Sequence, residues 1–251
     1  MGGVIIAPID GVRIARGGRP RNEGLPRKVL HCALAGVAML ALAACGPRRV
    51  QSTVPRFTDD FASYADGTQY GEGARFGRWL VEFGGFGAVR VTDGSLELVP
   101  AQAATTSVTH SALVTGPLLT TPIVFDVRVF TGAQLRVGDL PNPWEAAWII
   151  WAFTDVAHCY YFLPKPNGWE LAKRDPAYRG GQRILATGDA PKFRVNRWYD
   201  VRVTHRGAEM IVSVDGQEVT RFVDTERPYR EGKIALYSED AAVRFDDVRV
   251  F

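Results

Sequence analysis

From Arg56 to the C-terminus, short segments that alternate apolar and polar residues follow one another, separated by glycine, proline, asparagine and aspartate. Alternation with a period of two is typical of strands with one buried face, and the separating residues favour turns. No segment keeps the spacing of an amphipathic helix. The sequence therefore predicts an all-β domain, a two-sheet antiparallel jelly-roll sandwich that buries alternate residues of both sheets.

The alternation also predicts the individual strands. Asp215 and Gly216 lie between two of them, and this dipeptide readily adopts the positive φ angles of a type I′ turn, which predicts a tight hairpin. There is no internal repeat and no second block of composition, so a single domain is expected. The predicted strands are residues 86–91, 95–99, 123–130, 146–153, 160–163, 169–174, 183–187, 198–205, 209–214, 217–223, 232–238 and 242–250.

The N-terminal part has the features of an export signal. Arg27 and Lys28 precede an apolar stretch, residues 29–42, that is too short for an ordinary membrane-spanning helix. The stretch ends in Leu-Ala-Ala-Cys-Gly, which resembles the bacterial lipobox, and the thiol of Cys45 is the expected diacylglycerol acceptor. The alternatives are an ordinary secretory signal or a buried apolar helix with a chance cysteine. The expected organisation is a signal peptide with an upstream extension (1–44), a lipidated tether (45–55) and the jelly-roll domain (56–251).

The charge distribution limits the partners. The formal net charge is +3, but residues 1–44 hold six Lys or Arg against two Asp or Glu, which leaves 24 basic and 25 acidic residues in the rest of the chain. Domains that bind nucleic acid normally carry a clear positive excess. We therefore expect no nucleic-acid partner. The export signal and Cys45 predict a lipid-anchored protein of the cell envelope, with its domain outside the cytoplasm.

The cysteines exclude a disulfide within the predicted domain. Cys32 lies in the leader, Cys45 is the expected lipidation site, and Cys159 is the one cysteine that remains. Cys159 lies in an aromatic run without a nearby base in sequence, so we interpret it as a small core thiol rather than a nucleophile.

Several segments carry a resemblance to a known superfamily. They are Asp-Gly-Ser-Leu-Glu-Leu (93–98), Asn-Arg-Trp-Tyr-Asp-Val-Arg-Val (196–203), Gly-Lys-Ile-Ala-Leu-Tyr (232–237) and Phe-Asp-Asp-Val-Arg-Val (245–250). In this order they resemble the concanavalin-A-like lectin and glucanase superfamily. The run Tyr-Tyr-Phe-Leu-Pro-Lys-Pro-Asn-Gly-Trp-Glu-Leu (160–171) is similar to the bacterial family described as 3-keto-disaccharide hydrolase-like, close to glycoside hydrolase family sixteen. The resemblance implies a curved concanavalin-A-like jelly roll whose concave face binds carbohydrate.

The catalytic pattern of family sixteen is absent. Its hydrolases place two glutamates and an aspartate on one strand, because retaining hydrolysis needs two carboxyl groups about 5 to 5.5 Å apart. Residues 144–151 hold a single carboxylate, Glu145, so classical family-sixteen chemistry is not expected. Cleavage of a keto sugar does not need this pair of carboxyl groups. Its ketone acidifies the neighbouring C–H bond, so a single base permits elimination. Glu145 and His158 are the candidate catalytic residues.

The candidate ligand-binding residues are aromatic platforms for sugar rings and polar groups for sugar hydroxyls. Trp148 and Trp151 point to opposite faces of one predicted strand, so at least one of them is expected in the core. For each tryptophan the alternative is core packing, and for each charged residue it is simple solvation. The candidates are Trp144, Trp148, Trp151, Tyr161, Trp169, Glu170, Lys173 and Arg174.

A structural calcium ion is implied by the resemblance. In family-sixteen-like folds an aspartate of the last strand binds calcium together with backbone carbonyl groups, and Asp246 and Gly94 match those positions, with residues 58–59 nearby. Carboxylate and carbonyl oxygens are ligands that Ca²⁺ prefers. The alternative is an exposed Asp246 beside Arg244 or Arg249.

Three functional hypotheses follow. The first is a membrane-anchored lipoprotein whose jelly roll binds a glycan or oligosaccharide, as a monomer. The second is a glycoside hydrolase of the 3-keto-disaccharide type. The third is a structural envelope protein, which predicts a concave face without exposed aromatic residues. No phosphate-binding loop, paired-cysteine zinc pattern or catalytic serine motif occurs in the sequence.

Overall fold

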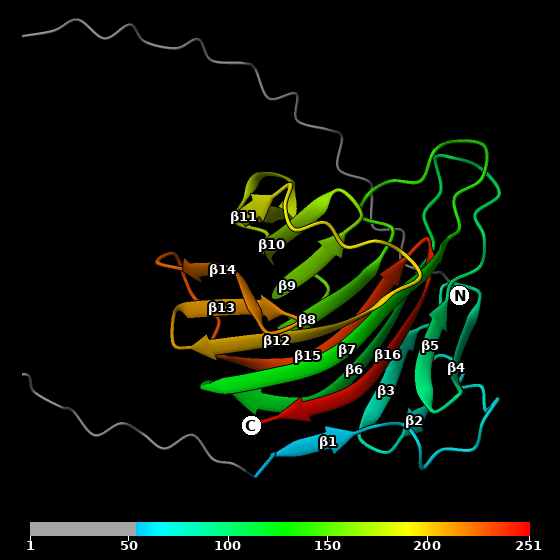
Figure 1. Ribbon diagram of the computed structural model, residues 1–251, viewed down its shortest axis with the longest axis horizontal. Coiled ribbons are helices and arrows are strands. Elements are labelled where there is room, and N and C mark those ends of the chain that lie inside the picture. Colours follow the sequence, from blue (N-terminus) through cyan, green and yellow to red (C-terminus); the bar gives the residue numbers. More distant parts are fainter. Residues whose placement is uncertain (1–53) are drawn as a thin grey trace, which may run out of the picture. The chain divides into compact units, whose positions relative to one another are not determined.

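A computed structural model describes residues 54–251, so the predictions for the leader, for Cys45 and for most of the tether concern residues outside the described range. Two eight-stranded sheets pack face to face, and every strand pairing is antiparallel (Figure 1). The predicted all-β, two-sheet jelly roll is thereby confirmed. We call the sheet that contains the last strand sheet 1 and the other one sheet 2.

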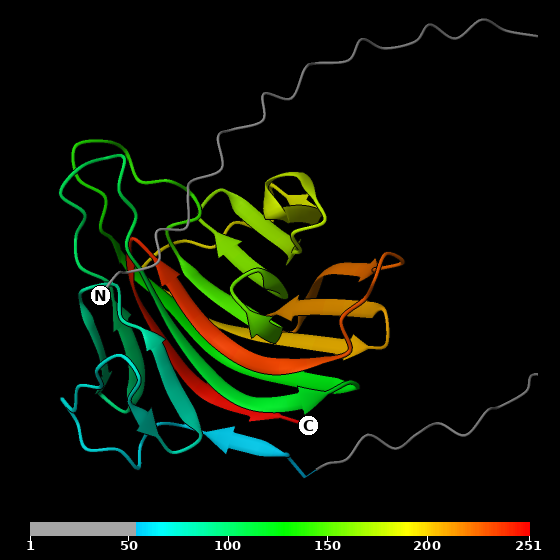
Figure 2. The same ribbon diagram turned by 180° about the vertical axis from the view of Figure 1, so that it is seen from behind.

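Sheet 1 has the order β14 (Gln217–Val223), β13 (Glu209–Val214), β12 (Trp198–Arg206), β7 (Ile123–Gln134), β16 (Ala241–Val250), β5 (Ser95–Val99) and β4 (Ala88–Thr92), with β1 (Phe57–Asp59) paired to β16. Sheet 2 has the order β11 (Gln182–Gly188), β10 (Gly168–Arg174), β9 (His158–Lys165), β8 (Ala147–Asp155), β15 (Glu231–Glu239), β6 (Ser111–Thr120), β3 (Trp79–Phe83) and β2 (Arg75–Phe76). The strands β6, β7, β15 and β16 curve through the middle of the sandwich, which is visible from both sides (Figures 1 and 2).

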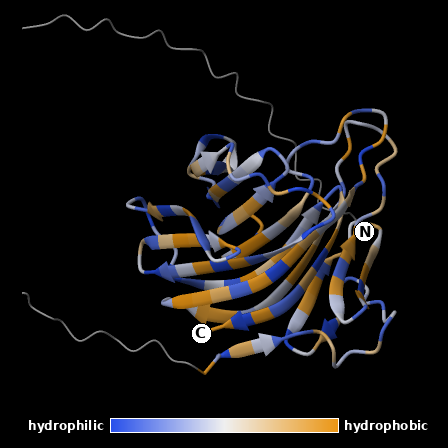
Figure 3. Ribbon diagram, viewed as in Figure 1, coloured by the Kyte–Doolittle hydropathy of each residue, from blue (hydrophilic) through white to orange (hydrophobic). Residues whose placement is uncertain are grey.

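Apolar side chains that alternate along the strands fill the space between the sheets. In β3, Trp79 and Val81 are buried in this core, whereas Leu80 between them is partly exposed. Trp79 and Trp151 of sheet 2 and Phe125 of sheet 1 are 0% exposed within one continuous core. Figure 3 shows the resulting bands of hydrophobic and hydrophilic residues along the strands. Burying an aliphatic or aromatic side chain of this kind stabilises the fold by roughly 1.5–3 kcal/mol.

The hairpin between β13 and β14 has the predicted turn. Asp215 has a φ of 50° and Gly216 a φ of 78°, so both central residues lie in the left-handed region that a type I′ turn requires. The prediction of a tight Asp-Gly hairpin is confirmed.

Helical structure is scarce in the described part of the chain. Between residues 54 and 251 it consists of one short 3₁₀ element, η1 (Arg179–Gly181). Accordingly, the described residues contain no helix with the length and apolar character needed to cross a membrane.

Candidate functional site

The outer side of sheet 2, turned away from the core, carries a second apolar cluster. Strand register explains how it forms. On β15, Tyr237 lies opposite Trp148 of β8 on one side and Leu113 of β6 on the other, and Ile150 of β8 lies opposite Tyr161 of β9. Because side chains directly opposite share a face, these residues form adjacent rows. We call this surface the aromatic face.

A depression lies in the aromatic face, with a volume of about 30 Å³. A water molecule needs about 10–15 Å³ of such space, so the depression has room for about two water-sized atoms and none for a whole sugar ring. Its lining residues are Phe83, Leu113, Trp148, Ile150, Phe153, Val156, Cys159, Tyr161, Arg174, Tyr237 and Glu239.

Three aromatic rings form the centre of the aromatic face. The ring centroid of Trp148 lies 4.5 Å from that of Tyr161 and 5.3 Å from that of Tyr237. The indole Nε1 of Trp148 donates a hydrogen bond to the carbonyl oxygen of Trp144 at 2.9 Å, which fixes the orientation of the ring. Tyr161 and Tyr237 are buried, whereas Trp148 and Trp144 are partly exposed. Trp148 is therefore the central ring of this cluster that a ligand can reach.

Glu239 is the carboxylate of the depression. Its side chain is nearly buried, and its Oε2 accepts a hydrogen bond from the hydroxyl of Tyr237 at 3.0 Å. Burial raises the pKa of Glu239 from 4.5 to about 7, and the neighbouring charges of Asp240 and Glu145 act in the same direction. The Tyr237 hydrogen bond and the positive charge of Arg174 act against this rise in pKa. Glu239 thus changes its protonation near neutral pH.

Arg174 is the cation of the depression. Its Nε is buried without a hydrogen-bond partner among residues 54–251. Its charge influences the pKa of Glu239, Tyr161 and Tyr237, yet no carboxylate of the described residues lies within ion-pair distance of its guanidinium. A guanidinium has five N–H donors in a fixed fork, so Arg174 keeps unused donors beside Glu239.

Glu170 belongs to a polar group at the edge of the aromatic face. One of its oxygens accepts a hydrogen bond from the hydroxyl of Tyr161, and the other lies 3.2 Å from the ammonium nitrogen of Lys165. Gln182 donates to the same Tyr161 hydroxyl. Glu170 is therefore already paired with Lys165, and its hydrogen bond to the Tyr161 hydroxyl holds that ring in place.

Of the eight predicted ligand-binding residues, the structure brings together five on the outer side of sheet 2: Trp144, Trp148, Tyr161, Glu170 and Arg174. The other three point between the sheets, so their prediction is corrected. Trp151 is 0% exposed and Trp169 is 7% exposed in the core, where Trp169 donates to the carbonyl of Ala190. Lys173 is 0% exposed and bonded to Asp224. The reason is strand alternation, which turns Lys173 inward when Arg174 points outward.

The two candidate catalytic residues both lie beside the depression rather than in it. Glu145 is 0% exposed and is ion-paired with Arg136, and its Oε2 has no partner among the described residues. His158 is the first residue of β9, and its Nδ1 is 2.9 Å from the carboxylate of Asp155 while its ring faces Tyr229. Neither side chain lines the depression, so a ligand seated there does not contact them in this arrangement.

Glu239 and Tyr237 are the site residues that sequence reasoning missed. A usable signal was present, because Tyr237 and Glu239 are two residues apart on one strand and therefore share a face. The missing information was that β15 lies beside β8, which places Glu239 next to the tryptophans.

The carboxylates implied for calcium have partners within the protein. Asp246 accepts a hydrogen bond from the backbone N–H of Asp247 at 2.7 Å and lies 3.6 Å from Arg128, while burial raises its pKa. The carboxylate of Asp59 is engaged by Trp79, Tyr64 and the N–H of Phe61. Gly94 occupies the β4–β5 turn with a φ of 67°. Within residues 54–251, no group of three or more His, Cys, Asp or Glu side chains is placed to hold a metal, and calcium stays a prediction.

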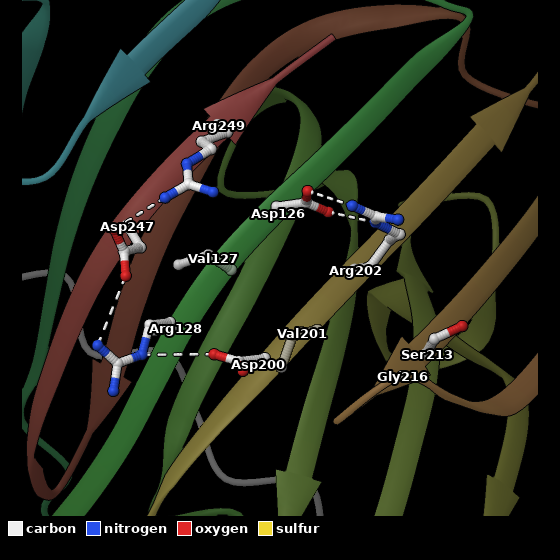
Figure 4. A pocket seen from close by; sticks show the side chains of 10 residues that line it. All are labelled: Asp126, Val127, Arg128, Asp200, Val201, Arg202, Ser213, Gly216, Asp247 and Arg249. Carbon is white, nitrogen blue, oxygen red and sulfur yellow. Dashed lines mark hydrogen bonds and ion pairs between the residues drawn. The ribbon is translucent and has the colours of Figure 1, made fainter. Parts of the chain in front are cut away.

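The outer side of sheet 1 offers a larger but different groove, of about 620 Å³, lined by charged residues (Figure 4). Two of its arginines pair with aspartates on the neighbouring strand, Arg202 with Asp126 at 2.6 Å and Arg128 with Asp200 at 3.4 Å. Arg249 pairs with Asp247 of its own strand at 3.2 Å. The arginines of this groove are therefore neutralised by aspartates within the protein, in contrast to Arg174 on sheet 2.

Comparison with known proteins gives a family match over the second half of the chain. Residues 127–251 match the model of the family described as 3-keto-alpha-glucoside-1,2-lyase-like domain. That range includes most of β7 and every strand from β8 to β16, and with them Trp148, Arg174 and Glu239. A search of curated proteins found no match to the chain.

Three solved structures illustrate the fold. A Bacillus subtilis protein of unknown function with a galectin-like fold has a TM-score of 0.52 at 15% identity, over 74% of this chain and 97% of that one. A structure described with endo-acting O-glycanases of human gut microbiota that initiate mucin breakdown has a TM-score of 0.54 at 13% identity, over 78% and 98%. SCLam, a non-specific endo-β-1,3(4)-glucanase of family GH16, has a TM-score of 0.50 at 14% identity, over 78% and 90%.

At these identities the likeness to solved structures concerns the fold, whereas the family match concerns the sequence. The chain therefore has the jelly-roll fold of these structures, and its residues 127–251 match the family described as 3-keto-alpha-glucoside-1,2-lyase-like domain.

Proposed function

We propose that the aromatic face binds a carbohydrate, with the sugar ring packed against Trp148. The observation that carries this proposal is the combination of a partly exposed tryptophan with two polar groups, Arg174 and Glu239, around one depression. Binding sites typically join an apolar wall to a few convergent polar groups. The C–H face of a sugar packs on an indole, while Arg174 and Glu239 provide donors and an acceptor for its oxygens. A structural protein without a small ligand has no need for an unpaired guanidinium beside an aromatic ring.

Trp148→Ala is expected to weaken glycan binding by about tenfold or more, because stacking and apolar contact of one ring are worth about 1.4 kcal/mol or more. The measurement is isothermal titration calorimetry with the hits of a glycan array, on protein that carries Cys45→Ser. Trp198→Ala is the matched control, since Trp198 is a partly exposed tryptophan of sheet 1 that lies against Arg128. Equal loss of affinity in both variants contradicts the placement of the site.

A second candidate function is elimination on a 3-keto glycoside, and a specific observation favours it. Glu239 has a pKa near 7, so a useful fraction is carboxylate at neutral pH and can act as a general base. The base removes the proton from C2, next to the ketone. The electrons form an enolate on the C3 oxygen, which the charge of Arg174 stabilises. Return of those electrons restores the C3 ketone, forms the C1–C2 double bond and expels the group on C1 as an alkoxide, which takes a proton from the protonated Glu239 or from water.

Under this second function, Glu239→Gln is expected to lower turnover of 3-keto-α-glucosides by about 100-fold or more while sugar binding is retained. Release of the alcohol from C1 is measured by chromatography. Glu170→Gln serves as the control, because Glu170 is paired with Lys165 at the edge of the same face. Undiminished turnover in Glu239→Gln excludes Glu239 as the base, and absence of turnover in the unaltered protein leaves the binding function alone.

A further inference from the structure

We propose that the aromatic face selects sugars that carry a carboxylate, and that Arg174 recognises this group. The inference rests on the proposed carbohydrate-binding function and names the class of sugar that the site prefers. Its basis is the guanidinium of Arg174, which has a buried N–H without an acceptor and no acidic side chain within ion-pair distance among the described residues.

The lysines on the outer side of sheet 2 are neutralised within the protein. Lys165 lies 3.2 Å from Glu170, and Lys233 lies 3.2 Å from Glu82. Among residues 54–251, Arg174 differs, because its Nε is buried and unpartnered and its guanidinium has no acidic partner within ion-pair distance. Withdrawing a charged N–H donor from water is costly unless an acceptor replaces the lost solvation. Arg174 is partly exposed, and its buried Nε leaves a donor that a ligand anion can satisfy.

The size of the depression favours a small planar anion on a larger ring. About 30 Å³ has room for about two water-sized atoms, which is the number of oxygens in a carboxylate. A guanidinium pairs with a carboxylate through two parallel N–H···O bonds. A uronic acid meets both conditions, since its ring lies over Trp148 while its carboxylate enters the depression toward Arg174.

Glu239 makes this recognition depend on pH. When it is ionised, Glu239 repels a ligand carboxylate, and when it is protonated it can donate a hydrogen bond to it. Because its pKa is about 7, affinity for an acidic sugar is expected to fall as pH rises through that value. Three other groups that line the depression, Cys159, Tyr161 and Tyr237, do not change their protonation between pH 5 and 9. Burial raises the pKa of Cys159 to about 12, and it raises the pKa of Tyr161 and Tyr237 well above the ordinary tyrosine range.

The test compares glucuronate and galacturonate oligosaccharides with their methyl esters, which differ in the charged group alone. In calorimetric titrations of the full chain with Cys45→Ser, the acids are expected to bind about tenfold tighter than the esters at pH 6, because a charge-assisted pair is worth about one decade. Arg174→Gln is expected to abolish this difference and Arg174→Lys to restore part of it. Trp148→Ala is expected to weaken acid and ester alike. Thermal unfolding of each variant verifies that it is folded.

The outcomes separate this inference from the function on which it rests. Equal affinity for acid and ester, with clear binding of both, overturns carboxylate selection and leaves carbohydrate binding standing. Equal affinity for a sulfated neutral sugar and for the uronate overturns the assignment of a carboxylate. Absence of binding for uronates, esters and neutral glycans alike means that the proposed function itself is wrong.

Discussion

Replacing Lys173 with methionine is expected to destabilise the fold by about 3–5 kcal/mol, the cost of leaving a buried charge without its partner. Lys173 and Asp224 are both 0% exposed, and the ammonium lies 2.9 Å from the Asp224 carboxylate. The same ammonium donates to the backbone carbonyls of Glu226 and Arg227 at 2.8 and 2.6 Å. The substitution therefore leaves the buried Asp224 carboxylate without this counter-charge and two carbonyl groups without this donor, while Tyr160 and the N–H of Glu226 still donate to Asp224.

Urea unfolding followed by tryptophan fluorescence measures this loss. Lys192→Met is the control, because Lys192 is exposed, and a change within about 0.5 kcal/mol is expected there. Combining Lys173→Met with Asp224→Asn is expected to recover part of the stability, since removing both charges costs less than removing one. If the single variant loses less than about 1 kcal/mol, Asp224 is not held as a buried anion by Lys173.

The same residue shows what the sequence could and could not predict. The pattern Trp-Glu-Leu-Ala-Lys-Arg placed Lys173 and Arg174 on one strand, and alternation requires opposite faces for them. Which of the two faces is the core depends on the partner sheet, and the sequence of one strand does not contain that information. Lys173 points inward because Asp224, after β14, supplies the counter-charge there.

The strands with clear alternation were predicted well, whereas β1, β2, β3 and β6 were not predicted. Residues 209–214 and 217–223 match β13 and β14, whereas β6 (Ser111–Thr120) was not predicted because Gly116 and Pro117 favour turns. In the structure Gly116 serves packing, since a Cβ there would lie 2.8 Å from the Ile234 side chain and 2.9 Å from the Trp79 ring. Pro117 lies where the β6–β15 register shifts, at a bulge that tolerates a missing N–H.

The candidate site was predictable on β8 to β10 and not on β15. Trp148, Tyr161 and Arg174 lie on strands that follow one another in the chain and pair in order, so a local reading brings them together. Glu239 reaches the same face through a strand that follows much later in the chain and inserts between β8 and β6. Such non-local pairing depends on the whole fold, and for that reason the sequence led to Glu145, at the entry of β8, and not to Glu239.

Glu239→Gln is expected to stabilise the protein at pH 8 by up to about 3 kcal/mol and to have little effect at pH 5. The folded-state pKa of Glu239 is about 7, raised by burial from an ordinary value of 4.5, and one unit corresponds to about 1.4 kcal/mol. Below pH 4.5 the carboxyl is protonated in both the folded and the unfolded states, so it contributes no pH dependence. Between pH 4.5 and 7 the folded state binds the proton more tightly, so stability falls as pH rises through this window.

Above pH 7 the full cost of the buried carboxylate is present, and glutamine removes it. Chemical unfolding of both proteins at pH 5 and pH 8 measures the difference. His205, whose pKa burial lowers to about 4, titrates in both proteins and cancels in the comparison. Glu170→Gln is expected to give no gain at pH 8, because Glu170 is paired with Lys165. An equal effect of Glu239→Gln at both pH values means that Glu239 ionises normally. A gain at pH 8 alone identifies a carboxylate kept at a cost to stability, as is common for groups that bind or react with a ligand.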